Sequence, residues 1–277
     1  MTAATIARQP GRTGLYVRAF WGLMLRDARV LLREFVPFVL RTIMNPLLFT
    51  FVFTYVFPKI GASITPGGLT KVSFATVIAP GLMAVAIFFQ GIAAVALPLA
   101  TELGGTREIE DRVMAPLPVS MVALEKVIWS GLQSIIAAAV VLPMILLVSA
   151  EPVSISVASW PMLIVTVLLA ALVAGYLGLV IGTVVKPKQI GLIFSLVVVP
   201  VTFLGCTYYP WQQLSSIRWL QIVCLINPLV YVSEGLRTAL TPEIPHMPVI
   251  AVLSALLVLL AGLGTLGTWL FMRRVID

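Results

Sequence analysis

The sequence predicts an all-α polytopic membrane protein. Two observations support this prediction: the amino-acid composition and the length of the apolar runs. Of 277 residues, 60% are hydrophobic and 10% are charged, with a mean hydropathy of +1.08. A soluble domain carries about 25% charged residues. The apolar runs are long and unbroken instead of alternating at every second residue, which favours membrane-spanning helices over a β-barrel.

Residues 1–34 are expected to form a cytoplasmic N-terminal segment that ends in an amphipathic helix over Gly14–Glu34. At 100° per residue, its arginines fall on one arc of about 80°, opposite several apolar side chains. The arginines are Arg18, Arg26, Arg29 and Arg33, and the apolar residues are Tyr16, Phe20, Met24 and Leu31. This pattern predicts an interface helix that lies on the membrane surface. The alternative is an ordinary helix with a solvated face.

Residues 35–277 are expected to form one membrane domain of six transmembrane helices. Each apolar run is long enough, or nearly long enough, for the roughly 20 residues that a crossing requires. Within the second run, Pro80 and Pro98 are expected to break the helix. The predicted spans are Phe35–Phe57, Val72–Thr101, Met121–Ser149, Met162–Val185, Gln189–Cys206 and Met247–Met272.

Small residues in the fourth predicted span form two small-xxx-small pairs, Ala171/Gly175 and Gly178/Gly182. Such pairs let two helices approach closely. Specific contact with a second subunit is one interpretation, and chance occurrence in a span rich in glycine and alanine is the other.

The distribution of basic residues predicts the orientation in the membrane. With six spans, both termini share one side, and 14 of the 18 Lys and Arg residues lie there. The other side has Lys59, Lys71, Arg218 and Arg237. By the positive-inside rule, both termini are then cytoplasmic. The net charge of +7 favours contact with anionic lipid and gives no reason to expect a nucleic-acid partner.

A polar segment, Thr101–Ser120, separates the second and third predicted spans. Thr106 is a good N-cap, acidic residues follow in the first turn, and Pro116 and Pro118 stop the helix. A short cytoplasmic surface helix over Arg107–Met114 is therefore expected, with a solvated loop as the alternative. The charged residues of the segment are Glu102, Arg107, Glu108, Glu110, Asp111 and Arg112.

A second irregular region, about residues 207–246, precedes the last predicted span. It begins with an aromatic cluster of Tyr208, Tyr209 and Trp211, which is typical of a membrane interface. Two short helices interrupted at Asn227–Pro228 predict a re-entrant hairpin on the outer side, with Glu234 and Arg237 one turn apart.

The sequence contains no catalytic constellation and no metal-ligand spacing, so neither catalytic nor metal-binding residues are expected. There is no phosphate-binding loop of the type G-x-x-x-x-G-K-[ST], and the chain is therefore not expected to hydrolyse ATP itself. The only histidine is His246, and the two cysteines are Cys206 and Cys224. These cysteines either form a disulfide or serve as small buried residues. Charges cluster at span ends, which counts against a carrier driven by an ion gradient.

Three stretches resemble the membrane subunits of ABC type-2 transporters, the exporter permeases. GTREIEDRVMAPLPVS at Gly105–Ser120 is similar to the family's Gly-Thr-x-Glu segment with its Pro-containing turn. NPLVYVSEGLR at Asn227–Arg237 is similar to the motif before the last span, and Ala79-Pro80-Gly81 lies in the second span. The segment before Gly105-Thr106 is Thr-Glu-Leu-Gly, whereas the usual family segment is Glu-Arg-Glu-x.

The resemblance implies a permease subunit of an ATP-driven exporter in a bacterial cytoplasmic (inner) membrane. Its expected partners are a separate ATP-binding subunit, which would hold the ATP and Mg, a second permease subunit and membrane lipids. The interface helix and the charged residues of Thr101–Ser120 would contact the ATP-binding subunit. A lipophilic drug-like or lipid-like substrate is expected, with a polysaccharide or glycolipid as the alternative within this family and an ion-driven carrier as the alternative from another class.

The resemblance also suggests which residues lie near the substrate exit, in the re-entrant region. These candidates are Tyr208, Tyr209, Trp211, Asn227, Tyr231, Glu234 and Arg237.

Overall fold

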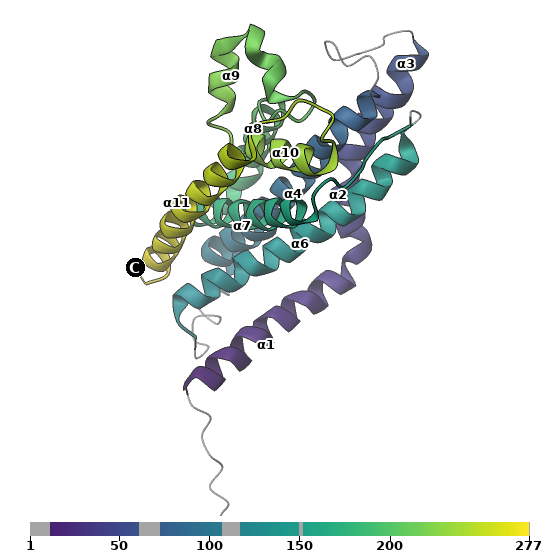
Figure 1. The fold of residues 1–277 in the computed structure, drawn as a ribbon. Helices are drawn as coiled ribbons and strands as arrows, with labels where there is room; N and C mark the ends of the chain where they lie inside the picture. The colour runs from purple at the N-terminus through teal and green to yellow at the C-terminus, as the bar shows by residue number, and fades with distance from the viewer. Residues whose placement is uncertain (1–11, 61–72, 107–116, 150–151, 277) are drawn as a thin grey trace, which may run out of the picture.

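The computed structural model describes residues 12–60, 73–106, 117–149 and 152–276, and the regular elements in these ranges are helices (Figure 1). Five of them are long and apolar enough to cross a membrane. They cover Phe35–Val56, Phe74–Gly104, Val119–Val148, Trp160–Val184 and Val249–Val275. The prediction of an all-α polytopic membrane protein is confirmed.

The fifth predicted span corresponds to α8 (Pro187–Phe203), which has only 17 residues. At 1.5 Å per residue this helix is about 26 Å long, whereas a hydrocarbon core is about 30 Å thick. A sixth candidate appears when α9 (Arg218–Cys224) and α10 (Pro228–Leu240) are counted together. The described residues thus supply five or six candidate spans, and the six-span topology stays a prediction.

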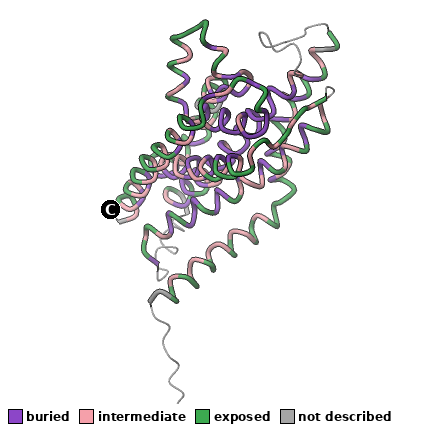
Figure 2. The backbone as a smooth tube through the Cα atoms, viewed as in Figure 1, coloured by how far each residue is buried: buried purple, intermediate pink, exposed green. Residues whose placement is uncertain are grey.

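The chain begins with α1 (Arg12–Arg33), which lies at one end of the bundle and continues through Glu34 into α2 (Phe35–Phe51) (Figure 1). The helix then continues as η1 (Val52–Val56) and α3 (Phe57–Lys59). Most residues of α1 are exposed or half-buried (Figure 2). This distribution agrees with the amphipathic pattern of the sequence.

The central helix of the bundle is α4 (Phe74–Thr101), which is buried along most of its length (Figure 2). It begins at Ser73, whose hydroxyl accepts a hydrogen bond from the Thr76 N–H at 3.3 Å. The breaks expected at Pro80 and Pro98 are absent, since α4 runs through both prolines and continues into η2 (Glu102–Thr106). Packing by neighbouring helices makes proline tolerable inside a membrane helix.

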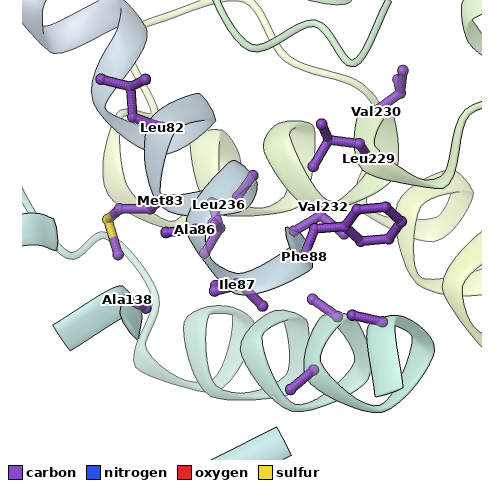
Figure 3. Packing of buried hydrophobic residues seen from close by; sticks show 14 of the residues in the cluster. Leu82, Met83, Ala86, Ile87, Phe88, Ala138, Leu229, Val230, Val232 and Leu236 are labelled. Atoms are coloured by element: carbon purple, nitrogen blue, oxygen red, sulfur yellow. The ribbon is translucent and has the colours of Figure 1, made fainter. Parts of the chain in front are cut away.

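Three helices enclose α4. They are α6 (Val119–Val148), α7 (Trp160–Val184) and α10, and α11 (Val249–Ile276) packs on α7 and α10 from outside. Figure 3 shows side chains of α4, among them Ile87 and Phe88, in one cluster with Val232 and Leu236 of α10. α6 begins at Val119, two residues before the Met121 start that the sequence suggested. The core of the protein therefore lies along α4.

The small residues of α7 allow the close packing inside this subunit. A Cβ atom on Gly178 would lie 2.7 Å from the Ile92 carbonyl oxygen of α4, and one on Gly182 would lie 2.9 Å from the Ala96 Cα. A Cβ on Gly175 would meet the Ser130 hydroxyl of α6 at 2.5 Å. These glycines are needed for contacts within one chain, which gives them a role without a second subunit.

The re-entrant region consists of η3 (Trp211–Ser216), α9 and α10. The two helices meet at 95°, and the Asn227 side chain caps α10 by accepting a hydrogen bond from the Leu229 N–H at 3.0 Å. The short 3-10 turn η3 precedes α9, which starts at Arg218. The bend at Asn227–Pro228 agrees with the expected hairpin.

A Cβ on Gly81 of α4 would lie closer to a neighbouring segment than a Cβ on any of the α7 glycines named above. Replacing Gly81 by alanine tests this close packing. A Cβ there would lie 2.0 Å from the Thr207 carbonyl oxygen, so the backbone would have to move. We expect Gly81→Ala to destabilise the purified protein by about 1–3 kcal/mol, measured as a lower thermal unfolding temperature in detergent. The control is Gly262→Ala on α11, where a Cβ meets nothing within 4 Å. Equal unfolding temperatures for the two variants would contradict this packing.

Candidate functional site

The end of α4 carries a buried ion pair. The Lys126 ammonium of α6 donates a hydrogen bond to Oε2 of Glu102 at 2.7 Å, and the two side chains are only 6% and 8% exposed. Removing one partner of a buried pair leaves a charge without compensation, which costs about 3–5 kcal/mol. The pair therefore fixes the end of α4 against the start of α6. The carboxylate of Glu102 lies inside the helical bundle, and contact between Glu102 and a partner subunit stays a prediction.

Residues 107–116 lie outside the described residues, and with them the whole surface helix predicted over Arg107–Met114, which we call the predicted coupling helix. The sequence-predicted contacts in it are Arg107, Glu108, Glu110, Asp111 and Arg112. Both flanks of the segment are described. A Cβ on Gly104 would lie 2.5 Å from Cγ of Pro187, and Leu117 is buried. The segment is thus attached to the bundle at both ends, beside the turn that joins α7 and α8.

The four arginines of the predicted amphipathic face lie on exposed positions of α1, as the pattern predicts. They are Arg18, Arg26, Arg29 and Arg33. The opposite face contacts protein, since Tyr16, Phe20 and Leu23 pack against a buried cluster that includes Val122 of α6. Trp21 remains 59% exposed. Part of the apolar face of α1 thus packs on the bundle, whereas other apolar side chains of α1, among them Leu25 and Leu32, remain exposed. The position of α1 on the membrane surface stays a prediction.

A first cavity of about 560 Å³ lies between α1, α2, α4 and α6. Its charged lining residues balance, with three basic and three acidic side chains. The basic residues are Arg26, Arg41 and Lys126, and the acidic residues are Asp27, Glu34 and Glu102. Trp129 and several alanines and leucines complete the wall. This cavity is a polar vestibule beside the root of the predicted coupling helix, and we refer to it as the vestibule.

A second cavity of about 330 Å³ lies between α2, α4 and α8, and we call it the apolar cavity. Its wall is largely aromatic and aliphatic. The aromatic lining residues are Phe49, Phe89, Phe194, Phe203 and Tyr208. Arg41 is the sole charged side chain among the described residues that line it, and Arg41 and Ala93 line both cavities. The two cavities have volumes typical of ligand-binding pockets, about 300–1,000 Å³.

A glutamine pair marks the boundary between the two cavities. The Gln90 amide of α4 donates a hydrogen bond to the Gln133 side-chain oxygen of α6 at 3.1 Å. Gln90 lines the apolar cavity and Gln133 lines the vestibule. This hydrogen bond gives each side-chain amide a partner, and burying an amide without a partner costs free energy. The pair also places polar atoms at the junction of the two cavities.

A second buried ion pair, Glu234–Arg237, holds the re-entrant region together. Both side chains are 0% exposed. Oε1 of Glu234 also accepts a hydrogen bond from the Trp211 N–H at 2.9 Å, and Oε2 accepts one from the Met247 N–H at 2.7 Å. Arg237 donates to the Cys206 carbonyl at 3.1 Å. These bonds join α10 to η3, to the turn after α8 and to the approach to α11.

Four of the other five predicted exit residues form hydrogen bonds within the same region. The Asn227 amide donates to the Val201 carbonyl at 2.7 Å. Three aromatic side chains donate to nearby carbonyls: Tyr209 to Phe203 at 2.6 Å, Trp211 to Gln221 at 3.1 Å and Tyr231 to Leu225 at 2.8 Å. Among the seven candidates, Tyr208 alone is on the described wall of either cavity. A role at a substrate exit remains a prediction for all seven.

Sequence reasoning did not assign a functional role to four residues that line the cavities: Arg41, Gln90, Lys126 and Gln133. The two glutamines could have been recognised from the sequence as candidate cavity residues, because each lies inside a long uncharged run. A polar side chain at such a position needs a partner or a cavity.

An apolar helical bundle with a polar vestibule and an apolar cavity is the architecture of a membrane transport component. The family model of the ABC-2 type transporter matches residues 18–241. The chain therefore belongs to this family, whose members are the membrane component of a transporter and normally work with an ATP-binding subunit. No individual characterised protein matched the sequence.

The Glu234–Arg237 pair gives a direct prediction for stability. Arg237→Met leaves the Glu234 carboxylate buried without its cation, so we expect a loss of about 3–5 kcal/mol. Replacing both residues, as in Glu234→Leu with Arg237→Met, removes both charges and should recover part of that loss. Thermal unfolding of the purified proteins measures both effects. A single variant as stable as the parent would show that the pair contributes little.

Proposed function

We propose that this chain is the permease subunit of an ATP-driven exporter that moves a lipophilic drug-like or lipid-like substrate out of the cell. The observation that carries the proposal is the apolar cavity, because its wall of phenylalanine, tyrosine and aliphatic residues suits an apolar ligand. Membership of the ABC-2 type transporter family supplies the transport role. The direction of transport and the substrate class belong to the proposal.

Energy comes from a separate ATP-binding subunit that docks on the cytoplasmic side. The docking surface comprises the segment 107–114 and the exposed arginine face of α1. The buried Glu102–Lys126 pair lies between that surface and the vestibule. A push on the coupling helix is therefore transmitted to the wall of the vestibule through the end of α4, which the ion pair joins to α6.

The proposed location is the bacterial cytoplasmic membrane, with both termini on the cytoplasmic side. The excess of Lys and Arg near the termini and in the segment after α4 supports this orientation. Two permease subunits, identical or related, complete the transporter with two ATP-binding subunits. Membrane lipids surround the exposed apolar faces of α2 and α11.

Co-purification tests the partnership. The full-length chain, co-expressed with an ATP-binding-cassette subunit from the same genome, is expected to elute with that subunit as one complex. In liposomes, lipophilic substrates should stimulate ATP hydrolysis by this complex severalfold, whereas glycans should not. Failure of the two proteins to associate would overturn the proposed function, and stimulation by glycans alone would favour a polysaccharide or glycolipid substrate.

Charge reversal in the predicted coupling helix tests the route of energy transfer. Glu108→Lys combined with Glu110→Lys should reduce ATP-dependent transport at least tenfold, because both changes place cations at a helix start that favours acids. The amount of protein in the membrane should not change.

The matched control for this variant is Glu243→Lys, an exposed position in the loop that follows α10. The measurement is substrate transport together with ATP hydrolysis in proteoliposomes. Normal transport by the double variant would assign the coupling role to another part of the chain.

A further inference from the structure

The vestibule and the apolar cavity are neighbours along one face of α4, and a single charged residue belongs to both. Arg41 of α2 lines each cavity, opposite Ala93 of α4, which does the same. Gln90 and Gln133 bond to each other at this boundary. The junction therefore presents a guanidinium and two amides, and the apolar cavity extends from it toward Phe49 and Tyr208.

The charge balance of the vestibule singles out Arg41. Lys126 is paired with Glu102 at 2.7 Å. Arg26 and Asp27 each have an interaction within the protein and come from α1. Arg41 forms no hydrogen bond or ion pair with another described residue. It lies on an exposed position of α2, one and a half to two turns from the start of the helix.

Glu34 is the acidic group nearest in sequence, but its position differs from that of Arg41. It lies at the turn between α1 and α2 and lines only the vestibule. The apolar cavity therefore has a positive charge at its mouth and no carboxylate among its described lining residues. A charge beside an apolar wall acts on a bound ion more strongly than the same charge in bulk water.

The aromatic wall on its own would suit a lipophilic cation, because ring faces attract positive charge. Arg41 opposes that choice, since a cation in the apolar cavity would lie near the guanidinium without a compensating carboxylate. An anionic group has the opposite preference, because guanidinium forms charge-assisted, often bidentate hydrogen bonds with phosphate and carboxylate. The two glutamine amides can add neutral hydrogen bonds.

From this arrangement we infer that the two cavities form one site for an amphiphile with an anionic head. The phosphate or carboxylate binds Arg41 at the junction, with Gln90 and Gln133 beside it, and the apolar body fills the cavity between α2, α4 and α8. The inference rests on the proposed function for its biological role, but the binding itself is independent of ATP. It selects anionic lipophiles over cationic lipophiles of the same size.

The test uses the full-length permease in nanodiscs of neutral phosphatidylcholine and a dodecyl phosphate that carries a photoreactive diazirine on its chain. Light-induced labelling, mapped by mass spectrometry of peptides, should fall on α2 and α4 around Phe49 and Phe89. A dodecyltrimethylammonium probe with the same diazirine should label these peptides at least tenfold less. Equal labelling by the two probes would overturn the inference.

Substitutions at the junction separate charge from shape. Arg41→Gln should reduce labelling by the phosphate probe about tenfold, the loss expected when a charged hydrogen bond is removed, while Arg41→Lys should retain most of it. Ala93→Phe should block labelling by both probes by filling the junction. Arg218→Gln is the matched control, an exposed arginine of α9 outside both cavities. Unchanged labelling of the Arg41→Gln protein, with an unfolding temperature equal to the parent's, would refute the role of the guanidinium.

Competition then identifies the source of the anionic head. Phosphatidylglycerol in the nanodisc should displace the probe if a bilayer lipid uses the site, whereas displacement by unlabelled dodecyl phosphate alone indicates a single-chain solute. Either result supports the site. Inorganic phosphate should not compete, and displacement by it would contradict the requirement for an apolar body. Association with the ATP-binding subunit is measured separately, so failure of the proposed function and failure of this site give different results.

Discussion

The structure depends on the pairing of buried charges, and the Glu234–Arg237 pair is the clearest case. This pair lies where several segments of the chain meet. Its carboxylate and guanidinium bind backbone groups of η3, of the turn after α8 and of the residues before α11. In the apolar interior, water does not compete for these bonds, so the cost of an unmet partner is high. The pair fixes the sharp bend of the re-entrant region without a disulfide between Cys206 and Cys224.

The second buried pair acts at the opposite end of α4. Glu102 and Lys126 hold the last turn of that helix, while Arg237 approaches the Val77 carbonyl near its first turn at 3.5 Å. Between these ends, the glycines of α7 and the Gly81 contact with Thr207 bring the backbones close. α4 is thus fixed along its length. The cavities lie on the side that α2 covers, and α2 itself is largely exposed.

The difference in burial between α4 and α2 bears on how the two cavities could change during transport. One wall of the site belongs to a rigid, buried helix, and the other belongs to α1 and α2, whose surfaces are mostly exposed (Figure 2). Movement of α2 relative to α4 changes both cavities at once, because Arg41 of α2 and Ala93 of α4 each line both of them. In the proposed mechanism, force that enters near Glu102 reaches this junction through the end of α4.

Hydropathy, charge placement and turn residues were sufficient to predict the helical membrane fold, the amphipathic α1 and the bend at Asn227–Pro228, because each depends on local periodicity or capping. The same reasoning noted the i,i+3 spacing of Glu234 and Arg237. It could not show that both are completely buried, that Lys126 pairs with Glu102, or that Gln90 meets Gln133, since these partners come from distant segments. Only the packing of α2, α4, α6 and α8 against one another turned Arg41 into the charged residue common to both cavities, because a cavity is a property of packed helices and not of any one of them.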